Sequence, residues 1–256
     1  MNILITGGTG FIGSNLIQKL IKDDNNIVLL TRDIKKAGKI EGKNKLYTVE
    51  YDNNNYEKLN IYLKDISFNI DLVFHFAANM KYLGNKKRSF LDNATFTEKL
   101  LEWSVSNNVK KFIYASSIDV MGPNISKTFP LNEEYVCKPV STYGMSKLKA
   151  ENLVIFYGTH TKLQTLSLRF GNIYGQGSKF IVFDIVRAIR EGISNPLIRF
   201  YHQIKASLLH MCYIDDLIDG IHQSSLLETK SGDIILLTGD QPASMERLIN
   251  ITSRLI

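Results

Sequence analysis

Short apolar runs alternate with amphipathic stretches along the first 170 residues. In residues 11–21 the apolar positions recur at the spacing of one helix face, whereas residues 27–30 form a continuous apolar run typical of a buried strand. This alternation predicts strands at 2–5, 27–30, 45–51, 71–76, 112–115 and 163–169, and helices at 11–21, 89–107 and 142–157.

Strands that alternate with helices indicate βαβ units and a parallel sheet covered on both faces. We therefore predict an α/β fold of the Rossmann type, with a doubly wound parallel sheet. Beyond residue 170 the pattern loosens, with expected helices at 180–190, 214–226 and 244–255 and a strand at 233–237. The expected organisation is a main domain over residues 1–170 and a small lobe over residues 171–256, interleaved with the first.

The composition is that of an ordinary globular protein. The 256 residues are 44% hydrophobic and 22% charged, which excludes disordered, collagen-like and disulfide-scaffold classes. The 31 Lys and Arg residues exceed the 25 Asp and Glu residues, but they are scattered along the chain, so nucleic-acid binding is not expected. A modest positive field also suits a small substrate that carries phosphates.

Other broad classes are excluded as well. No apolar run is long enough to span a membrane, and the N-terminus lacks the pattern of a signal peptide. Cys137 and Cys212 are isolated thiols, so the expected location is a reducing cytoplasm. The five histidines show no metal-ligand spacing with the cysteines, so no metal site is expected.

A glycine-rich turn follows the first expected strand and begins the first expected helix. Gly7 permits a tight turn, Gly10 lets the backbone approach a pyrophosphate, and Gly13 lets the helix pack close to the strand. Phe11 and Ile12 lie where the N–H groups and the dipole of the helix N-terminus hold an anion. The sequence therefore predicts a dinucleotide site.

The end of the second expected strand bears on the choice of dinucleotide. An acidic residue there accepts hydrogen bonds from a ribose 2′-hydroxyl, whereas an arginine pairs with a 2′-phosphate. Thr31 occupies the acidic position and Arg32 follows it, which favours NADP over NAD. The alternative is that Arg32 is solvated and that Asp33 binds the ribose.

The spacing Tyr-x-x-x-Lys occurs three times, at residues 82 and 86, 143 and 147, and 201 and 205. Only the second pair lies near the start of an amphipathic helix with a serine pair, Ser116 and Ser117, at the end of the preceding expected strand. Here Tyr143 would transfer a proton, and Lys147 would lower its pKa and bind the cofactor ribose. Ser117 would donate a hydrogen bond to the substrate oxygen.

With these residues in place, the chain resembles the extended short-chain dehydrogenase/reductase family, the NAD(P)-dependent epimerase/dehydratase group. The resemblance covers residues 1 to about 250. It rests on 6–13 (TGGTGFIG), Asp52, 75–78 (HFAA), Asn93, 116–122 (SSIDVMG), 143–147 (YGMSK), 169–175 (RFGNIYG) and 213–216 (YIDD).

The resemblance implies further roles. Residues 1–170 would bind the dinucleotide and residues 171–256 the substrate, a nucleotide-sugar, in a homodimer formed through helices 89–107 and 142–157. Asp52 and Asn53 would flank the adenine, and Ala77 and Ala78 would line the passage of the cofactor. Asn93 would anchor the nicotinamide side. Asn172 would contact the substrate phosphates. On the alternative interpretation, Asp52 forms a turn and Asn172 caps its own loop.

The sequence also departs from relatives that remove water from the sugar. Those enzymes carry an Asp-Glu pair where this chain has Ile118 and Asp119, and isoleucine cannot transfer a proton, so dehydration is not expected. Asp119 remains a candidate for orienting a sugar hydroxyl. The chain also ends earlier than most family members, so we expect a reduced substrate lobe.

The expected function is therefore hydride transfer on a nucleotide-sugar, as a 4-keto reductase or an epimerase. One alternative is a protein that senses NAD(P) without catalysis, and another is a reductase of a carbonyl compound that is not a sugar. The sequence does not identify the sugar or its nucleotide.

Overall fold

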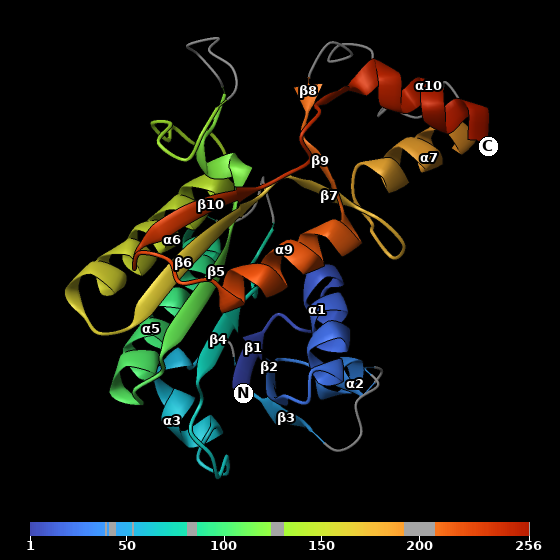
Figure 1. Ribbon diagram of the computed structural model, residues 1–256. Coiled ribbons are helices and arrows are strands. Elements are labelled where there is room, and N and C mark those ends of the chain that lie inside the picture. The colour runs from blue at the N-terminus through green and yellow to red at the C-terminus, as the bar shows by residue number, and fades with distance from the viewer. Residues whose placement is uncertain are drawn as a thin grey trace. The chain divides into compact units, whose positions relative to one another are not determined.

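The computed structural model describes residues 1–38, 40, 45–52, 54–80, 86–123, 131–191 and 208–255 (Figure 1). These residues form two compact units. The larger unit comprises Met1–Arg169 and Ile221–Leu236, and the smaller unit holds the described residues of 170–220 and 237–255. The chain therefore leaves the larger unit, returns to it and leaves it again.

A seven-stranded sheet in the order β10-β6-β5-β4-β1-β2-β3 forms the centre of the larger unit. Its strands are β1 (Asn2–Thr6), β2 (Asn26–Thr31), β3 (Leu46–Glu50), β4 (Leu72–His75), β5 (Lys111–Ser117), β6 (Gln164–Phe170) and β10 (Asp233–Leu237). The pairs β1·β2, β2·β3, β1·β4 and β4·β5 are parallel, and Ile3 is in register with Ile27 on one side and Leu72 on the other. The predicted Rossmann-type fold is confirmed. Its strand order reverses between β1 and β4, where such sheets bind ligands at their carboxyl ends.

Helices cover both faces of this sheet. They are α1 (Phe11–Lys22), α2 (Ile34–Ala37), the 3₁₀ turn η1 (Tyr56–Lys58), α3 (Leu59–Tyr62), α4 (Lys86–Phe90), the π-helical segment η2 (Leu91–Thr95), α5 (Phe96–Ser106), the 3₁₀ turn η3 (Ile118–Val120), α6 (Thr142–His160) and α9 (Ile214–Leu226). In Figure 1, α5 and α6 run side by side along one face of the sheet.

Alternate strand residues supply the two layers of the core, as the period of a strand requires. Leu4 and Val73 point to the layer that contains Leu100 of α5 and Val154 of α6. On the other side, Ile5, Leu29 and Ile17 of α1 surround Gly8.

The helix expected over 89–107 is present, and it contains a π-helical segment. The segment comprises α4, η2 and α5, and the backbone of η2 is π-helical. The Thr97 hydroxyl donates to the carbonyl oxygen of Asn93 over 2.5 Å at this point. A π-helical turn inside a helix is frequent at functional sites, and hydrophobic spacing does not reveal it.

Lys111, the first residue of β5, fixes the returning segment of the chain to the sheet. Its buried Nζ donates hydrogen bonds to the carbonyl oxygens of Ser224, Ser225 and Leu227 at the end of α9, over 2.8, 3.2 and 2.8 Å. An ammonium at the C-terminus of a helix satisfies carbonyl groups that have no partner within the helix.

The described residues of the smaller unit include two short strand pairs and the helices α7 and α10. β7 (Asn172–Tyr174) pairs in parallel with β9 (Met211–Tyr213), and β8 (Leu208–Leu209) pairs antiparallel with β11 (Ala243–Ser244). α7 (Val182–Glu191) and α10 (Met245–Leu255) pack around a small apolar cluster of Ile185, Ala188 and Met245. Among the described residues of both units, no helix has the length and apolar character needed to cross a membrane.

Candidate functional site

The glycine-rich turn packs tightly against the end of β4. Gly7 has φ +72°, and a Cβ there would lie 2.5 Å from the backbone N of Ala77. A Cβ at Gly13 would lie 2.5 Å from the carbonyl oxygen of Gly7. Gly10 is the N-cap of α1 and supplies no side-chain cap, so the first N–H groups of the helix, at Phe11 and Ile12, face the turn as an anion-binding end.

A buried chain of hydrogen bonds ties this turn to η2 and α5. The Thr6 hydroxyl lies 2.6 Å from His75 Nδ1 and accepts a hydrogen bond from the N–H of Ala77 over 3.2 Å, while His75 Nε2 lies 2.9 Å from the Thr97 hydroxyl. Burial lowers the pKa of His75 to about 3, so the imidazole is neutral at neutral pH. Ala77 and its partly buried neighbour Ala78 thus leave β4 beside the glycine turn.

A pocket of about 710 Å³ opens at the ends of β2 and β3. Its lining residues are Arg32, Asp33, Lys36, Glu50, Tyr51, Asp52 and Tyr62. The Asp33 carboxylate caps α2: it accepts a hydrogen bond from the N–H of Lys36 over 3.1 Å and pairs with its ammonium at 3.5 Å. The hydrogen bond from the Lys36 N–H lowers the pKa of Asp33. Arg32 and Lys36 add two cations to the same pocket.

Asp52 lines this pocket and also organises its own loop. One carboxylate oxygen accepts hydrogen bonds from the backbone N and the Nδ2 of Asn54, over 2.9 and 3.1 Å, and the other accepts from Asn55 Nδ2 over 2.6 Å. The hydrogen bond from the Asn54 N–H, followed by that from Asn55, lowers the pKa of Asp52. Asp52 forms a turn, as one of the two interpretations predicted. Asp52 also lines the pocket, and its contact with adenine stays a prediction. Asn53 lies outside the described residues.

Asn93 lies in η2 and connects two parts of the site. Its amide accepts a hydrogen bond from the N–H of Asn79 over 2.6 Å and donates to the carbonyl oxygen of Asn79 over 3.0 Å. Its Nδ2 also donates to the Ser146 hydroxyl over 2.8 Å. Asn93 therefore joins the segment that follows β4 to α6, and its amide is buried.

Ser117 and Tyr143 are brought together, with Asp119 beside them. Ser117, at the end of β5, caps η3 by accepting a hydrogen bond from the N–H of Asp119 over 3.1 Å, and its hydroxyl donates to the Asp119 carboxylate over 3.3 Å. Burial and the charge of Asp119 raise the pKa of Tyr143, and a hydrogen bond with Ser117 lowers it by less. The outcome differs from the sequence-based expectation of a lowered pKa, because Tyr143 is almost fully buried.

Lys147 lies one helical turn after Tyr143 and is 2% exposed. Its Nζ donates a hydrogen bond to the carbonyl oxygen of Ala115 and lies 4.1 Å from the centroid of the Tyr114 ring. Burial lowers the pKa of Lys147 to about 7, against the opposing effect of the Glu151 carboxylate. The ammonium is thus held against β5 by a carbonyl oxygen and an aromatic face.

Ser116, whose side chain alternates with that of Ser117 along β5, belongs to a buried ion-pair network. Its hydroxyl donates to Glu151 over 2.6 Å, and Arg169 forms two hydrogen bonds with the same carboxylate, over 2.7 and 3.1 Å. Arg169 also donates to the carbonyl oxygen of Glu133 over 3.1 Å. This network fixes α6 to β5 and β6.

Asn172 lies at the start of β7 in the smaller unit. Its N–H donates to the carbonyl oxygen of His210 over 2.8 Å, so its backbone belongs to the strand pair with β9. The substrate role of Asn172 stays a prediction.

Some predictions fall outside what the structure describes. Tyr82, Tyr201 and Lys205 of the two other Tyr-x-x-x-Lys pairs lie outside the described residues. Within the described ranges, no group of three His, Cys, Asp or Glu side chains could hold a metal ion.

Sequence reasoning missed three charged residues of this region. Arg88 and Asp92 pair at 2.8 Å four positions apart, and Glu151 follows Lys147 by one helical turn. Opposite charges at this spacing on a predicted helix were the available signal for the first pair. For Glu151, the signal was a carboxylate on the helix face that carries Tyr143 and Lys147.

Comparison with known proteins finds a matching family and several similar proteins. The sequence model of a family described as "NAD dependent epimerase/dehydratase family" matches residues 3–235. Protein CapI of Staphylococcus aureus is 29% identical over 235 residues, which are 86% of this chain and 68% of that protein. The UDP-glucose 4-epimerase of Vibrio cholerae is 30% identical over 223 residues, 85% of this chain and 65% of that protein.

The fold is shared with solved structures as well. UDP-glucuronic acid 4-epimerase from Bacillus cereus in complex with NAD has a TM-score of 0.82 and 25% identity, over 100% of this chain and 84% of that one. The chain spans about two thirds of the length of the two curated relatives.

Proposed function

Because the chain belongs to the NAD dependent epimerase/dehydratase family, we propose that it is an enzyme that moves hydride to or from a carbon–oxygen centre of a nucleotide-sugar. The observation that carries the proposal is the buried Ser117–Tyr143 hydrogen bond, with Lys147 on the same helix and the glycine turn at the end of β1, two strands from β5 in the same sheet. Relatives named as UDP-sugar epimerases support a nucleotide-sugar as the substrate class.

In this proposal each residue has one task. Tyr143 exchanges a proton with the substrate oxygen, and Ser117 donates a hydrogen bond to that oxygen. Lys147, placed against Ala115 and Tyr114, binds the cofactor ribose and supplies positive charge near the reaction. The dinucleotide supplies or accepts the hydride at its nicotinamide ring.

Two details support reduction of a 4-keto sugar over epimerisation. Burial keeps the pKa of Tyr143 above its usual value, so the phenol carries its proton at neutral pH and can give it to a carbonyl oxygen. Arg32 favours the binding of NADPH, which is the usual reductant in such reactions. The names of the relatives favour epimerisation, which begins with an alcohol and needs Tyr143 without its proton.

The pocket at β2 and β3 bears on the cofactor. We propose NADP, because Arg32 and Lys36 line the pocket and the Asp33 carboxylate caps α2. A 2′-phosphate carries negative charge and suits two cations. The Bacillus cereus neighbour holds NAD, which is the alternative.

The remaining roles extend the same proposal. The smaller unit would bind the substrate, with Asn172 near its phosphates, and Asp119 would orient a sugar hydroxyl. Ile118 stands where dehydration needs a carboxylate, which argues against loss of water. The exposed Val105 of α5 and Phe156 of α6 would lie in a homodimer interface, and the protein would work in the cytoplasm.

The test is incubation of the full chain with NADPH and a panel of nucleotide-sugars and 4-keto nucleotide-sugars. Loss of reduced-nicotinamide absorbance with a 4-keto sugar would support the reductase, and interconversion of epimers without cofactor consumption would support the epimerase. Dinucleotide binding without turnover of any panel member, or turnover only of simple ketones and aldehydes, would contradict the nucleotide-sugar proposal.

A further inference from the structure

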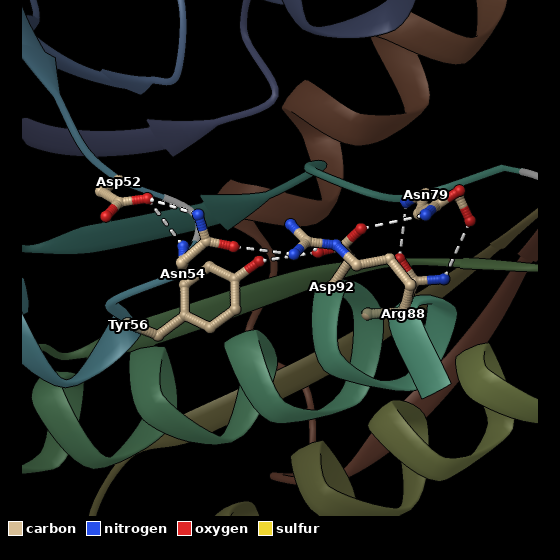
Figure 2. Close-up of polar contacts among 7 residues, drawn as sticks. Asp52, Asn54, Tyr56, Asn79, Arg88 and Asp92 are labelled. Carbon is tan, nitrogen blue, oxygen red and sulfur yellow. Dashed lines mark hydrogen bonds and ion pairs between the residues drawn. The ribbon is translucent and has the colours of Figure 1, made fainter. Parts of the chain in front are cut away.

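The Asp92 carboxylate lies at the centre of a polar network in the larger unit (Figure 2). It is 8% exposed, and both of its oxygens accept hydrogen bonds. Oδ1 lies 2.8 Å from Arg88 Nη2 and accepts from the Tyr56 hydroxyl over 3.0 Å, and Oδ2 accepts from Asn79 Nδ2 over 2.9 Å. A carboxylate this deeply buried requires such partners, because removal of charge from water is costly.

Arg88 extends the network towards the pocket. While Nη2 contacts Asp92, Nη1 donates to the amide oxygen of Asn54 over 2.9 Å, so the planar guanidinium joins two different segments. An amide that accepts through its oxygen must present its nitrogen elsewhere, and the Nδ2 of Asn54 donates to Asp52. Figure 2 shows the line of contacts from Asp92 through Arg88 and Asn54 to Asp52.

The network also extends towards α6. Asn79, held by Asp92 through its side chain, is held through its backbone by the Asn93 amide, which donates to the Ser146 hydroxyl. Ser146 in turn donates to the carbonyl oxygen of Tyr143 over 2.8 Å. Asp92 is therefore connected to Asp52 through Arg88 and Asn54. It is also connected, through Asn79, Asn93 and Ser146, to the helix that carries Tyr143.

The network fixes the orientation of the Asp52 side chain more tightly than the folding of the chain requires. Asp52 is exposed, and an exposed carboxylate contributes little to folding through its own loop contacts. Yet its orientation is set by the Asn54 side chain, whose orientation is set by an arginine anchored on a buried carboxylate. A side chain that is already ordered loses less conformational entropy when a ligand binds, which favours binding.

We propose that Asp92 and Arg88 are positioning residues that hold Asp52 in place to accept a hydrogen bond from the adenine amino group of the dinucleotide. The inference rests on the proposed function, since it requires a dinucleotide in the Arg32 pocket. In hypoxanthine an oxygen replaces the amino group, and a carboxylate held in place repels it. Asp92 and Arg88 thereby set the selectivity for adenine without touching the base.

The experiment compares dinucleotide binding by the wild type and three variants of the full chain, Asp92→Asn, Arg88→Met and Lys99→Met. The probes are NAD and NADP, each paired with its analogue that carries hypoxanthine in place of adenine, with affinities measured by calorimetry. Lys99→Met is the matched control: Lys99 also joins α5 to the segment after Asp52, through Glu57 at 3.3 Å, but among the described residues no side-chain hydrogen bond or ion pair links Lys99 or Glu57 to Asp52.

For the wild type, we expect a preference for adenine of about tenfold or more, because a hydrogen bond to a charged group is at stake. Asp92→Asn and Arg88→Met should lower this ratio at least about threefold, and Lys99→Met should leave it unchanged. A conserved ratio in both network variants, an equal change in the control, or a wild type without preference would overturn the inference.

The design separates the two proposals. If wild type binds neither dinucleotide, the proposed function fails and the inference fails with it. If wild type binds and turns over substrate but the network variants keep the full preference, only the inference fails. Arg88→Met removes a side chain that is 34% exposed, so it provides a folded test even if the buried Asp92→Asn variant unfolds.

Discussion

Ser117 and Tyr143, which come from β5 and α6, share a hydrogen bond that lowers the pKa of the phenol against the larger opposing effect of burial. Asp119 contacts the same serine hydroxyl and adds negative charge nearby. The pair thus places a proton donor and a hydrogen-bond donor beside each other at the carboxyl edge of the sheet, where ligands of this fold bind.

The first prediction concerns this pair. Tyr143→Phe should reduce turnover by about 10²- to 10⁴-fold, the usual contribution of a positioned acid or base. The variant should keep its affinity for the dinucleotide, because the ring remains. Steady-state kinetics and calorimetry check the two parts. Tyr135→Phe, which removes only an exposed hydroxyl bonded to Pro123, is the control and should behave as wild type. Unchanged turnover in Tyr143→Phe would remove Tyr143 from the mechanism.

The second prediction concerns the buried Glu151–Arg169 ion pair. Glu151→Gln leaves the Arg169 guanidinium buried without its anion, which should lower the free energy of unfolding by about 3–5 kcal/mol. Glu191→Gln removes a partner of Arg187 from an exposed pair at the same 2.7 Å separation and should change the free energy of unfolding little. Urea unfolding measures both. Equal losses would show that burial does not set the strength of the pair.

The third prediction separates two glycines of the turn. A Cβ at Gly13 meets backbone at 2.5 Å, whereas one at Gly10 meets backbone only at 3.2 Å. Gly13→Ala should therefore lower the melting temperature clearly. Gly10→Ala should stay folded but bind the dinucleotide weakly, because the methyl group occupies the space of the pyrophosphate. Thermal unfolding with and without NADP provides the measurement, and normal NADP binding by Gly10→Ala would contradict the turn's assigned role.

The fourth prediction concerns the pocket cations. Arg32→Ala should weaken NADP binding by about tenfold or more and change NAD binding little, because only NADP carries the 2′-phosphate. Lys35→Ala, an exposed neighbour in α2 that does not line the pocket, should affect neither. Dissociation constants for both dinucleotides decide the point. Equal weakening of NAD and NADP would favour a ribose contact instead.

The fifth prediction is a pH dependence of stability. Burial lowers the pKa of His75 to about 3 from its usual 6.5, so between these values the unfolded chain binds a proton that the folded chain does not. The free energy of unfolding should therefore decrease as the pH falls below about 6.5, with His75 contributing up to about 1.4 kcal/mol per pH unit. In His75→Gln this part of the slope should vanish. Urea unfolding at several pH values tests it, and identical slopes would be contrary evidence.

Much of the fold could be predicted because periodic patterns report burial directly. β1, α1 and β2 follow from apolar runs and one-sided spacing, and α9 and β10 occur where their patterns predicted them. The short helices α2 and α3 were not predicted, because four residues are too few to establish a period. The π-helical turn was not predicted either, and the side chain of Asn93 within it forms hydrogen bonds with Asn79 and Ser146, which are distant in sequence.

The residues of the candidate site could be picked out where a residue type and its spacing indicate a chemistry, and their roles stay predictions. The glycine turn, and Tyr143 with Lys147 and Ser117, belong to this class. The pKa of Tyr143 was not predictable, since it depends on the depth of burial that the assembled β5 and α6 create. The role of Arg88 and Asp92 was also hidden, because their partners come from the segments of Asn54 and Asn79.

The return of the chain through residues 221–236 has a consequence for dissection of the protein. A fragment that stops at Arg169 lacks β10 and so leaves the outer edge of β6 with open backbone groups, which invites pairing with other chains. The same cut removes the carbonyl oxygens that surround the buried ammonium of Lys111. No single cleavage of the polypeptide can therefore release the larger unit intact, and a fragment of that unit would need residues 221–236 grafted back.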